Sequence, residues 1–94
     1  MAPRPSSLRD SPVRDEPSPL GKLVGLIARA LVDRPEDVVV RESDNENPRI
    51  ELSVAQDDIG KVIGKDGRTA QSIRTLLAAA AMRAGKRAHL DIVD

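Results

Sequence analysis

Past the middle of this 94-residue chain lies the run Ile59-Gly60-Lys61-Val62-Ile63-Gly64-Lys65-Asp66-Gly67-Arg68-Thr69. Two glycines, Gly64 and Gly67, flank two polar residues, and a helical pattern begins directly afterwards. Glycine lacks a Cβ, so its backbone can approach another molecule closely. The first N–H groups of a helix lack intrahelical partners and carry partial positive charge. The run therefore suits a tight loop that presents main-chain amides to a phosphate.

The same run also has a simpler interpretation, because glycines between two short helices are often only a turn. Other phosphate motifs do not fit. A P-loop needs four residues between its first glycine and its Gly-Lys pair, whereas three residues separate Gly60 from Gly64. The dinucleotide fingerprint follows a strand, whereas residues 56–63 are expected to be helical. The residues that flank this run must therefore distinguish a phosphate-binding loop from a simple turn.

Composition excludes several classes of protein. The chain has no cysteine and one histidine, which rules out disulfides, thiolate metal sites and a multi-histidine site within one chain. No apolar run approaches the roughly 20 residues of a membrane span, and no apolar signal core begins the chain. We therefore expect a single small cytoplasmic domain with no metal, no cofactor and no membrane association.

The chain also contains no Phe, Trp or Tyr. Stacking of bases on aromatic rings is thus excluded, as is the aromatic sheet surface of an RNA-recognition motif. No serine–histidine–acid or cysteine nucleophile is available, and His89 is expected on the outer face of a strand near Asp91. We expect no enzyme. Any bases would meet aliphatic side chains and hydrogen-bonding groups.

The net charge is zero, but the charges are unevenly placed. Residues 33–58 contain nine acids and three arginines, whereas residues 60–88 contain seven basic residues and one acid. The positive segment holds the glycine loop. This asymmetry favours an anionic partner for one face of the molecule, although charges that cancel locally on a solvated surface are the alternative.

The predicted elements follow in order. Residues 1–17 are rich in proline and serine and are expected to be a disordered tail. Ser18 and Pro19 begin a helix as N-cap and first helical residue, and that helix ends after Asp33, ahead of Pro35. Its apolar stripe is Leu20, Leu23, Val24, Ile27 and Leu31. The four-residue spacing of Gly21 and Gly25 could allow close helix–helix contact.

Two strands are predicted next, over residues 36–42 and 48–54, joined by a turn at residues 44–47. In the second strand Ile50, Leu52 and Val54 alternate with polar residues, so one face is buried. A short helix over 56–63 leads into the glycine loop. A long helix runs from Arg68 to Ala84, its stripe being Ala70, Ile73, Leu77, Ala80 and Ala84, and Gly85 caps it. Residues 86–93 form the last strand.

The order helix, strand, strand, helix, helix, strand predicts an α+β fold: a three-stranded mixed sheet with three helices on one face. The run from Ile59 to Arg68 resembles the core motif of the KH domain, whose G-x-x-G loop clamps about four nucleotides of single-stranded nucleic acid. Ile73 falls where that motif places an apolar helix residue. The element order resembles the type II KH variant, so residues 18–94 are expected to form a single KH domain.

The chain resembles the KhpA family of bacterial single-KH proteins in its small size and in two stretches, Gly67-Arg68-Thr69-Ala70 and Arg74-Thr75-Leu76. That resemblance implies a single-stranded RNA-binding protein and RNA chaperone. It also implies association with a second KH protein, KhpB (also called Jag or EloR), and, in some bacteria, a link to cell-wall synthesis and cell length. Whether the chain forms a homodimer stays open.

The mechanism that we infer from the residues has two parts. Main-chain amides from Gly64 to Gly67 hold one or two phosphates, with charge added by Lys61, Lys65 and Arg68. Asp66 is expected to cap the next helix. One wall of an apolar groove for bases comes from Ile59, Val62 and Ile63, whose alternative role is core packing, and the other comes from the strand near Ala88 and Leu90.

A second class of function is a protein-interaction adaptor that has the KH fold but little RNA affinity. It would use small residues on the helices, Gly21 to Ala30 or Ala78 to Ala84, for pairing. The two glycines with a local basic cluster favour RNA binding.

Overall fold

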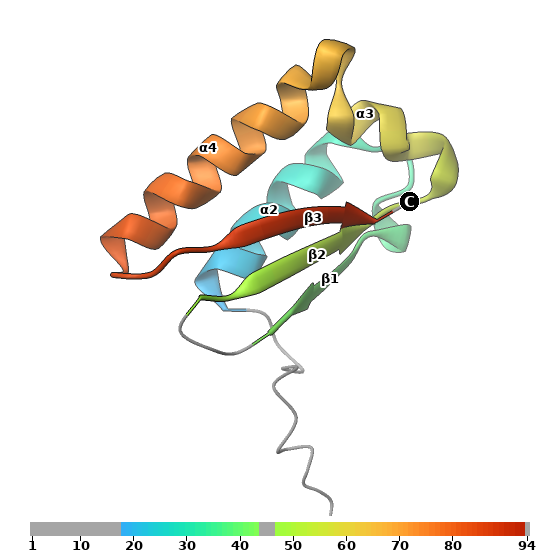
Figure 1. Cartoon of the computed structure of the whole chain (residues 1–94). Coiled ribbons are helices and arrows are strands. Elements are labelled where there is room, and N and C mark those ends of the chain that lie inside the picture. Colours follow the sequence, from blue (N-terminus) through green and yellow to red (C-terminus); the bar gives the residue numbers. More distant parts are fainter. Residues whose placement is uncertain (1–17, 44–46, 94) are drawn as a thin grey trace, which may run out of the picture.

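The structure, a computed structural model, describes residues 18–43 and 47–93 (Figure 1). Helix α2 (Pro19–Leu31) is followed by strands β1 (Val39–Glu42) and β2 (Arg49–Ser53), helices α3 (Ile59–Ile63) and α4 (Arg68–Arg83), and strand β3 (His89–Val93). Single 3-10 turns lie at Pro35–Asp37, Gln56–Asp58 and Lys65–Gly67. The element order is as predicted. The predicted tail and most of the predicted turn at 44–47 fall outside the described residues.

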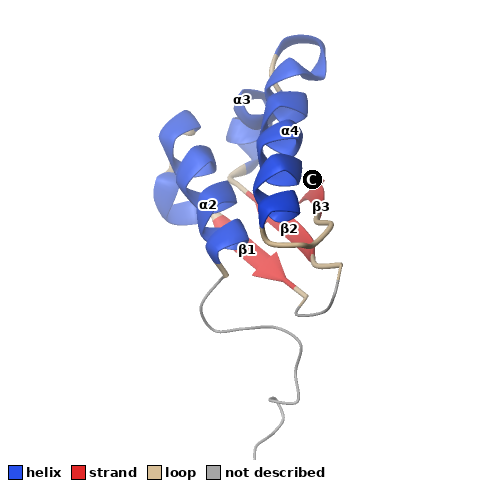
Figure 2. Ribbon diagram, turned by 90° about the vertical axis from the view of Figure 1, so that its left-hand side faces the viewer, coloured by secondary structure: helices blue, strands red, loops and turns tan. Residues whose placement is uncertain are grey.

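The three strands form one sheet in the order β1-β2-β3. Strand β1 pairs with β2 antiparallel, and β2 pairs with β3 parallel. Figure 2 shows the three helices on the same side of this sheet, with α2 nearer β1 and α4 nearer β3. The predicted mixed sheet with three helices on one face is confirmed.

Helix α2 begins as predicted. Pro19 is the first helical residue, and the Ser18 hydroxyl accepts a hydrogen bond from the Gly21 N–H at 3.3 Å. The helix ends at Leu31, two residues before the predicted end, since Val32 is extended. The extended backbone lets the half-buried Val32 pack against the core.

The buried face of α2 differs from the predicted stripe. It comprises Leu20, Gly21, Val24, Gly25 and Ala28, whereas Leu31 is exposed. Gly25 lies against the sheet: a Cβ added there would be 3.4 Å from Cγ2 of Val40 in β1. The missing side chain therefore allows close helix–sheet packing, and these glycines are not available for pairing with another molecule.

The sheet forms largely as the alternation predicts. Ile50 and Leu52 of β2 are completely buried beneath the helices. Strand β1 begins three residues later than predicted, because Pro35 opens a 3-10 turn that takes in Glu36 and Asp37. Strand β3 also begins three residues late, at His89, since the preceding residues connect the end of α4 to the sheet.

Helix α4 buries Ala70, Ile73, Leu77 and Ala81. The predicted stripe is therefore right in its first three members, but it continues through Ala81. Ala80 is only half-buried, and Ala84 is exposed. Gly85 has φ +73°, and the Lys86 N–H bonds to the Ala81 carbonyl at 2.8 Å. This is the Schellman arrangement, which confirms Gly85 as the capping glycine.

The core lies between the helices and the sheet. Its largest fully buried apolar residues are Val24, Ile50, Leu52, Val62 and Leu77, which come from α2, β2, α3 and α4. No helix within the described ranges is both long enough and apolar enough to cross a membrane.

Candidate nucleic-acid interface

The glycine loop has a backbone that its sequence requires. Gly64 has φ +78° and ψ 174°, a region that is essentially closed to other residues. A Cβ at Gly64 would lie 2.1 Å from Oγ1 of Thr69. Gly67 has φ +74° and ψ 12°, in the left-handed region, and a Cβ there would meet no atom within 4 Å. Glycine is thus required at position 64 by both the backbone conformation and the closeness of Thr69, and at position 67 by the backbone conformation alone.

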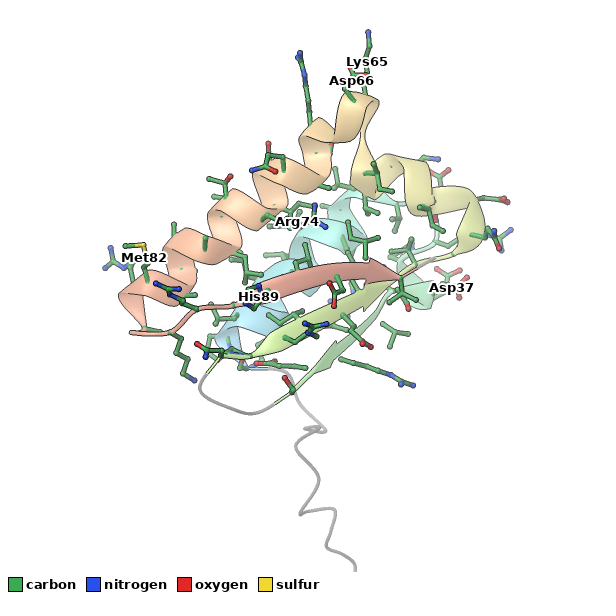
Figure 3. The ribbon with its side chains drawn as sticks, viewed as in Figure 1. Asp37, Lys65, Asp66, Arg74, Met82 and His89 are labelled. Atoms are coloured by element: carbon green, nitrogen blue, oxygen red, sulfur yellow. The ribbon has the colours of Figure 1, made fainter. Side chains whose placement is uncertain are left out.

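The loop lies at one tip of the molecule. Figure 3 shows Lys65 and Asp66 at this tip, pointing away from the body. Both side chains are exposed, as is that of Arg68. The Gly67 N–H bonds to the Gly64 carbonyl at 3.1 Å, and the Arg68 N–H bonds to the Lys65 carbonyl. Within the described residues, the polar side chains of the bend are therefore open to solvent, while Gly64 and Gly67 are half-buried.

The predicted capping role of Asp66 is wrong. The N-cap of α4 is Gly67, and no side chain from the described part of the chain caps that helix end. Asp66 is one residue too early and adopts a left-handed conformation with φ +58°, which aspartate tolerates better than most residues. As a result the first-turn amides of α4 have no side-chain acceptor, and the Asp66 carboxylate is exposed at the tip.

Lys61 is held by acids and does not extend toward the loop. Its ammonium lies 3.2 Å from Asp33 and 3.5 Å from Asp58. The hydrogen bond with Asp33 is the main reason that the pKa of Lys61 is raised. This contact ties α3 to the connection that follows α2, so the predicted phosphate role of Lys61 competes with a structural one.

Asp58 is the buried member of this cluster, with 2% of its surface exposed. Burial opposes its ionisation, but hydrogen bonds from the main chain of Asp33 and Arg34, together with the Lys61 ammonium, outweigh burial and lower the pKa of Asp58. The Arg34 N–H donates to the carboxylate at 3.1 Å. Within the described residues no group of three or more His, Cys, Asp or Glu side chains could hold a metal ion.

The three apolar residues before the loop have different environments. Val62 is completely buried and belongs to the core. Ile63 is half-buried and packs against the core, and Ile59 is half-buried. Core packing is therefore the role of Val62, which is not accessible to a base, whereas Ile59 and Ile63 retain exposed surface beside the loop.

A surface hollow of about 410 Å³ lies between α4 and β3. It is lined by Arg49, Gln71, Arg74, Thr75, Leu77, Ala78, Ala88, His89, Leu90 and Asp91. Ala88 and Leu90, predicted as one wall of a groove for bases, are among these lining residues. The other side of the hollow is α4, and none of Ile59, Val62 and Ile63, the predicted second wall, is among its lining residues. Figure 3 shows Arg74 and His89 on the two sides of this hollow.

The residues of α4 that line the hollow are not among the site residues predicted from the sequence. Gln71, Arg74, Thr75 and Ala78 follow helical spacing and lie beside the buried stripe of Ile73 and Leu77. That spacing was available as a signal, but only the position of β3 shows which flank of the stripe faces a groove. Arg49 in β2 was missed as well; its guanidinium pairs with Asp91 at 3.0 Å.

Comparison with known proteins gives a consistent result. A family model described as the KH domain of KhpA/KhpB matches residues 21–92. RNA-binding protein KhpA of Halalkalibacterium halodurans is 55% identical over 73 residues, which make up 77% of this chain and 96% of that protein. RNA-binding protein KhpA of Treponema pallidum is 51% identical over 74 residues, 78% of this chain and 92% of that protein.

Among solved structures, the fold is similar to part of Era. A crystal structure of Aquifex aeolicus Era bound to GDP and aluminium fluoride gives a TM-score of 0.59. A crystal structure of Era in complex with MgGDPNP and nucleotides 1506–1542 of 16S ribosomal RNA gives 0.60. Identity is 18% in both, over 83% of this chain, and the chain covers 31% of each Era chain. The likeness concerns the fold.

Proposed function

The chain belongs to the KhpA/KhpB family of KH domains, and from this premise we propose that it binds single-stranded RNA. Its relatives carry the name RNA-binding protein, which describes binding rather than catalysis. The observation that carries the proposal is the exposed loop at Gly64–Gly67, whose backbone needs its glycines and whose helix start has no side-chain cap.

In this proposal one phosphate lies against the loop. The amides of Lys65 and Asp66 and those of the first turn of α4 after Arg68 donate hydrogen bonds to it, and the positive end of the α4 dipole adds to the attraction. Lys65 and Arg68 supply mobile positive charge from the exposed tip. Lys61 contributes less, since Asp33 and Asp58 already hold its ammonium.

The bases that follow the phosphate enter the hollow between α4 and β3. Ala78, Ala88 and Leu90 give it aliphatic surface, and Gln71, Arg74 and Thr75 offer hydrogen-bonding groups. Ile59 and Ile63 flank the loop on the α3 side. Without aromatic stacking, which is worth about 1–3 kcal/mol per base, we expect weak binding that depends strongly on salt.

A charge reversal in the loop tests this proposal. Lys65→Asp places two adjacent acids, at positions 65 and 66, where the phosphate would lie. We expect RNA binding to be lost while the fold survives, because Lys65 is exposed. An RNA titration and a circular dichroism melt measure the two effects.

Lys22→Asp is the matched control, because Lys22 is exposed on α2, the helix nearer β1 and away from the hollow (Figure 2). Equal RNA affinity for the wild type and for Lys65→Asp would contradict the proposed mechanism.

We also propose, as the resemblance to KhpA proteins implies, that the chain acts as a cytoplasmic RNA chaperone with a KhpB-type KH protein as partner. A role in cell-wall synthesis and cell length belongs to the same proposal. Deletion of the gene in its own organism, with cell length and total RNA-bound protein measured, tests both parts.

A function as an interaction adaptor is the second candidate. One observation favours it: Leu26 on α2, and Leu76 and Met82 on α4, have 67%, 54% and 77% of their surface exposed. Of the small-residue segments expected to pair, Gly21 to Ala30 is largely unavailable, because Gly21, Gly25 and Ala28 are buried. Size-exclusion chromatography with and without RNA distinguishes a self-associating chain from an RNA-dependent assembly.

A further inference from the structure

A second surface hollow lies at the far end of α4. Its volume is about 380 Å³, and it is lined by Asn47, Met82, Gly85, Lys86 and Arg87. Figure 1 shows the connection from α4 to β3 at the end of α4 farthest from the glycine loop, and Figure 3 shows Met82 at that same end. Arg87 directly precedes Ala88 and His89, which line the first hollow. The linings of the two hollows are therefore continuous in sequence along residues 85–91.

Positive charge gathers at this junction. Arg83, Lys86 and Arg87 are exposed, and none of them forms an ion pair with another residue in the described ranges. Among the described residues lining the two hollows, Asp91 is the only acid, and Arg49 neutralises it at 3.0 Å. An anion that leaves the first hollow at this end thus meets cations that form no ion pair with any described residue.

The helix dipole accounts for only part of this charge. The C-terminus of a helix carries partial negative charge that a cation in the last turn offsets, and Arg83 occupies that last turn. Lys86 and Arg87 lie beyond the capping glycine, Gly85. The stabilising effect of the dipole on a cation falls off within the last turn of the helix, so it accounts for these two residues less well. Their position in the connection fits a ligand outside the helix.

We propose that Lys86 and Arg87 form a second phosphate-binding site, which holds nucleotides of the RNA strand after they leave the groove. This inference rests on the proposed function of the loop and groove. Helix α4 has 16 residues, so about 24 Å separate the glycine loop from the second site. Along that path cations recur at Arg68, Arg74 and Arg87. The footprint then extends beyond the roughly four nucleotides that a G-x-x-G loop clamps.

The experiment compares oligouridines of two lengths, about four and about eight nucleotides, on the full chain. The wild type should bind the longer one more tightly. The double variant Lys86→Gln/Arg87→Gln should bind the longer oligomer roughly tenfold more weakly and the shorter one unchanged. For the longer oligomer the slope of log affinity against log salt should fall in magnitude by about 1.4, which corresponds to two phosphate contacts on a single strand.

A second double variant, Lys22→Gln/Arg29→Gln, removes the same charge from the exposed surface of α2 and should change neither affinity. Circular dichroism melts confirm folding of both variants. Two results overturn the inference: unchanged affinity of the first variant for the longer oligomer, or equal weakening for both lengths, which would indicate a diffuse field in place of a site.

Failure of the proposed function has a different signature. In that case the wild type binds neither oligomer, or Lys65→Asp binds both as tightly as the wild type. Failure of the second site, seen as no length-dependent weakening on loss of Lys86 and Arg87, is thus distinguishable from failure of the proposed function.

Discussion

At the scale of single residues, the two loop glycines have different reasons for being glycine. Gly64 occupies a backbone region that other residues essentially never adopt, and Thr69 packs where its Cβ would be. Gly67 occupies the ordinary left-handed region with open space around it. The sequence motif has a glycine at both positions, but the two glycines differ in backbone conformation and in the atoms around them.

This difference predicts unequal costs of substitution. Gly64→Ala should lower the free energy of unfolding by about 3 kcal/mol or more, because backbone strain and a collision with Thr69 add together. Gly67→Ala should lower it by about 1 kcal/mol, the cost of the left-handed conformation alone. Urea denaturation of both variants measures the two values, and a Gly67→Ala variant less stable than Gly64→Ala would contradict the assignment.

Asp58 predicts a dependence of stability on pH. Its pKa is lowered from the ordinary value of 3.8, since its main-chain donors and Lys61 outweigh the effect of burial. A carboxylate with a lowered pKa in the folded state stabilises the fold above its unfolded pKa, and this stabilisation is lost as the pH falls through the folded pKa.

The variant Asp58→Asn should therefore be less stable than the wild type at pH 7, and the gap should narrow as the pH falls below about 4. Denaturant unfolding at a series of pH values measures the gap. Asp57→Asn is the control, because Asp57 is the exposed neighbour of Asp58. A gap that is constant across this range would show that the charge of Asp58 is not what stabilises the fold.

At the scale of elements, the start of α2 and the end of β1 are joined through one serine. The Ser18 hydroxyl accepts from the Gly21 N–H and donates to Glu42, whose other carboxylate oxygen accepts from the Ser18 N–H at 3.0 Å. Glu42 has only 7% of its surface exposed. The residue that caps helix α2 thus also donates the hydrogen bonds that the buried carboxylate of Glu42 accepts.

We expect Ser18→Ala to lower the free energy of unfolding by about 2 kcal/mol, more than a typical cap, because Glu42 loses a donor as well. A double-mutant cycle with Glu42→Gln should give a coupling of at least about 0.5 kcal/mol. Additive effects of the two substitutions would mean that Ser18 acts as a helix cap alone.

Helix α4 shows how one element serves both packing and binding. Its buried stripe of Ala70, Ile73, Leu77 and Ala81 fixes the helix on the sheet. The flank of that stripe, with Arg74 near its middle, then faces the edge of β3 across the hollow.

At the scale of the whole molecule, the core within the described residues begins after Ser18. Every residue of the core cluster, including those packed against it, lies between Leu20 and Ile92, and the family model matches residues 21–92. A chain that begins at Glu16, and so keeps the Ser18 amide, should have a free energy of unfolding within about 0.5 kcal/mol of the full chain.

Its RNA affinity should also be unchanged, since every residue proposed to contact RNA, including those that line the two hollows, lies at or after residue 47. Calorimetry and an RNA titration of the shortened chain check the two expectations. A clear loss of stability would place residues 1–15 in the fold, and a loss of affinity alone would place them in the interface.

The sequence by itself determined the order of elements, the mixed sheet with helices on one face, the capping residues at Ser18 and Gly85, and the glycine loop. These features depend on local chemistry: apolar periodicity, missing Cβ atoms and cap donors within a few residues. Only the tertiary structure decided which face of α2 is buried, that Lys61 pairs with Asp33 and Asp58, and that α4 walls the groove. Those outcomes depend on contacts between residues far apart in the chain, such as Gly25 with Val40 or Arg49 with Asp91, which no local pattern encodes.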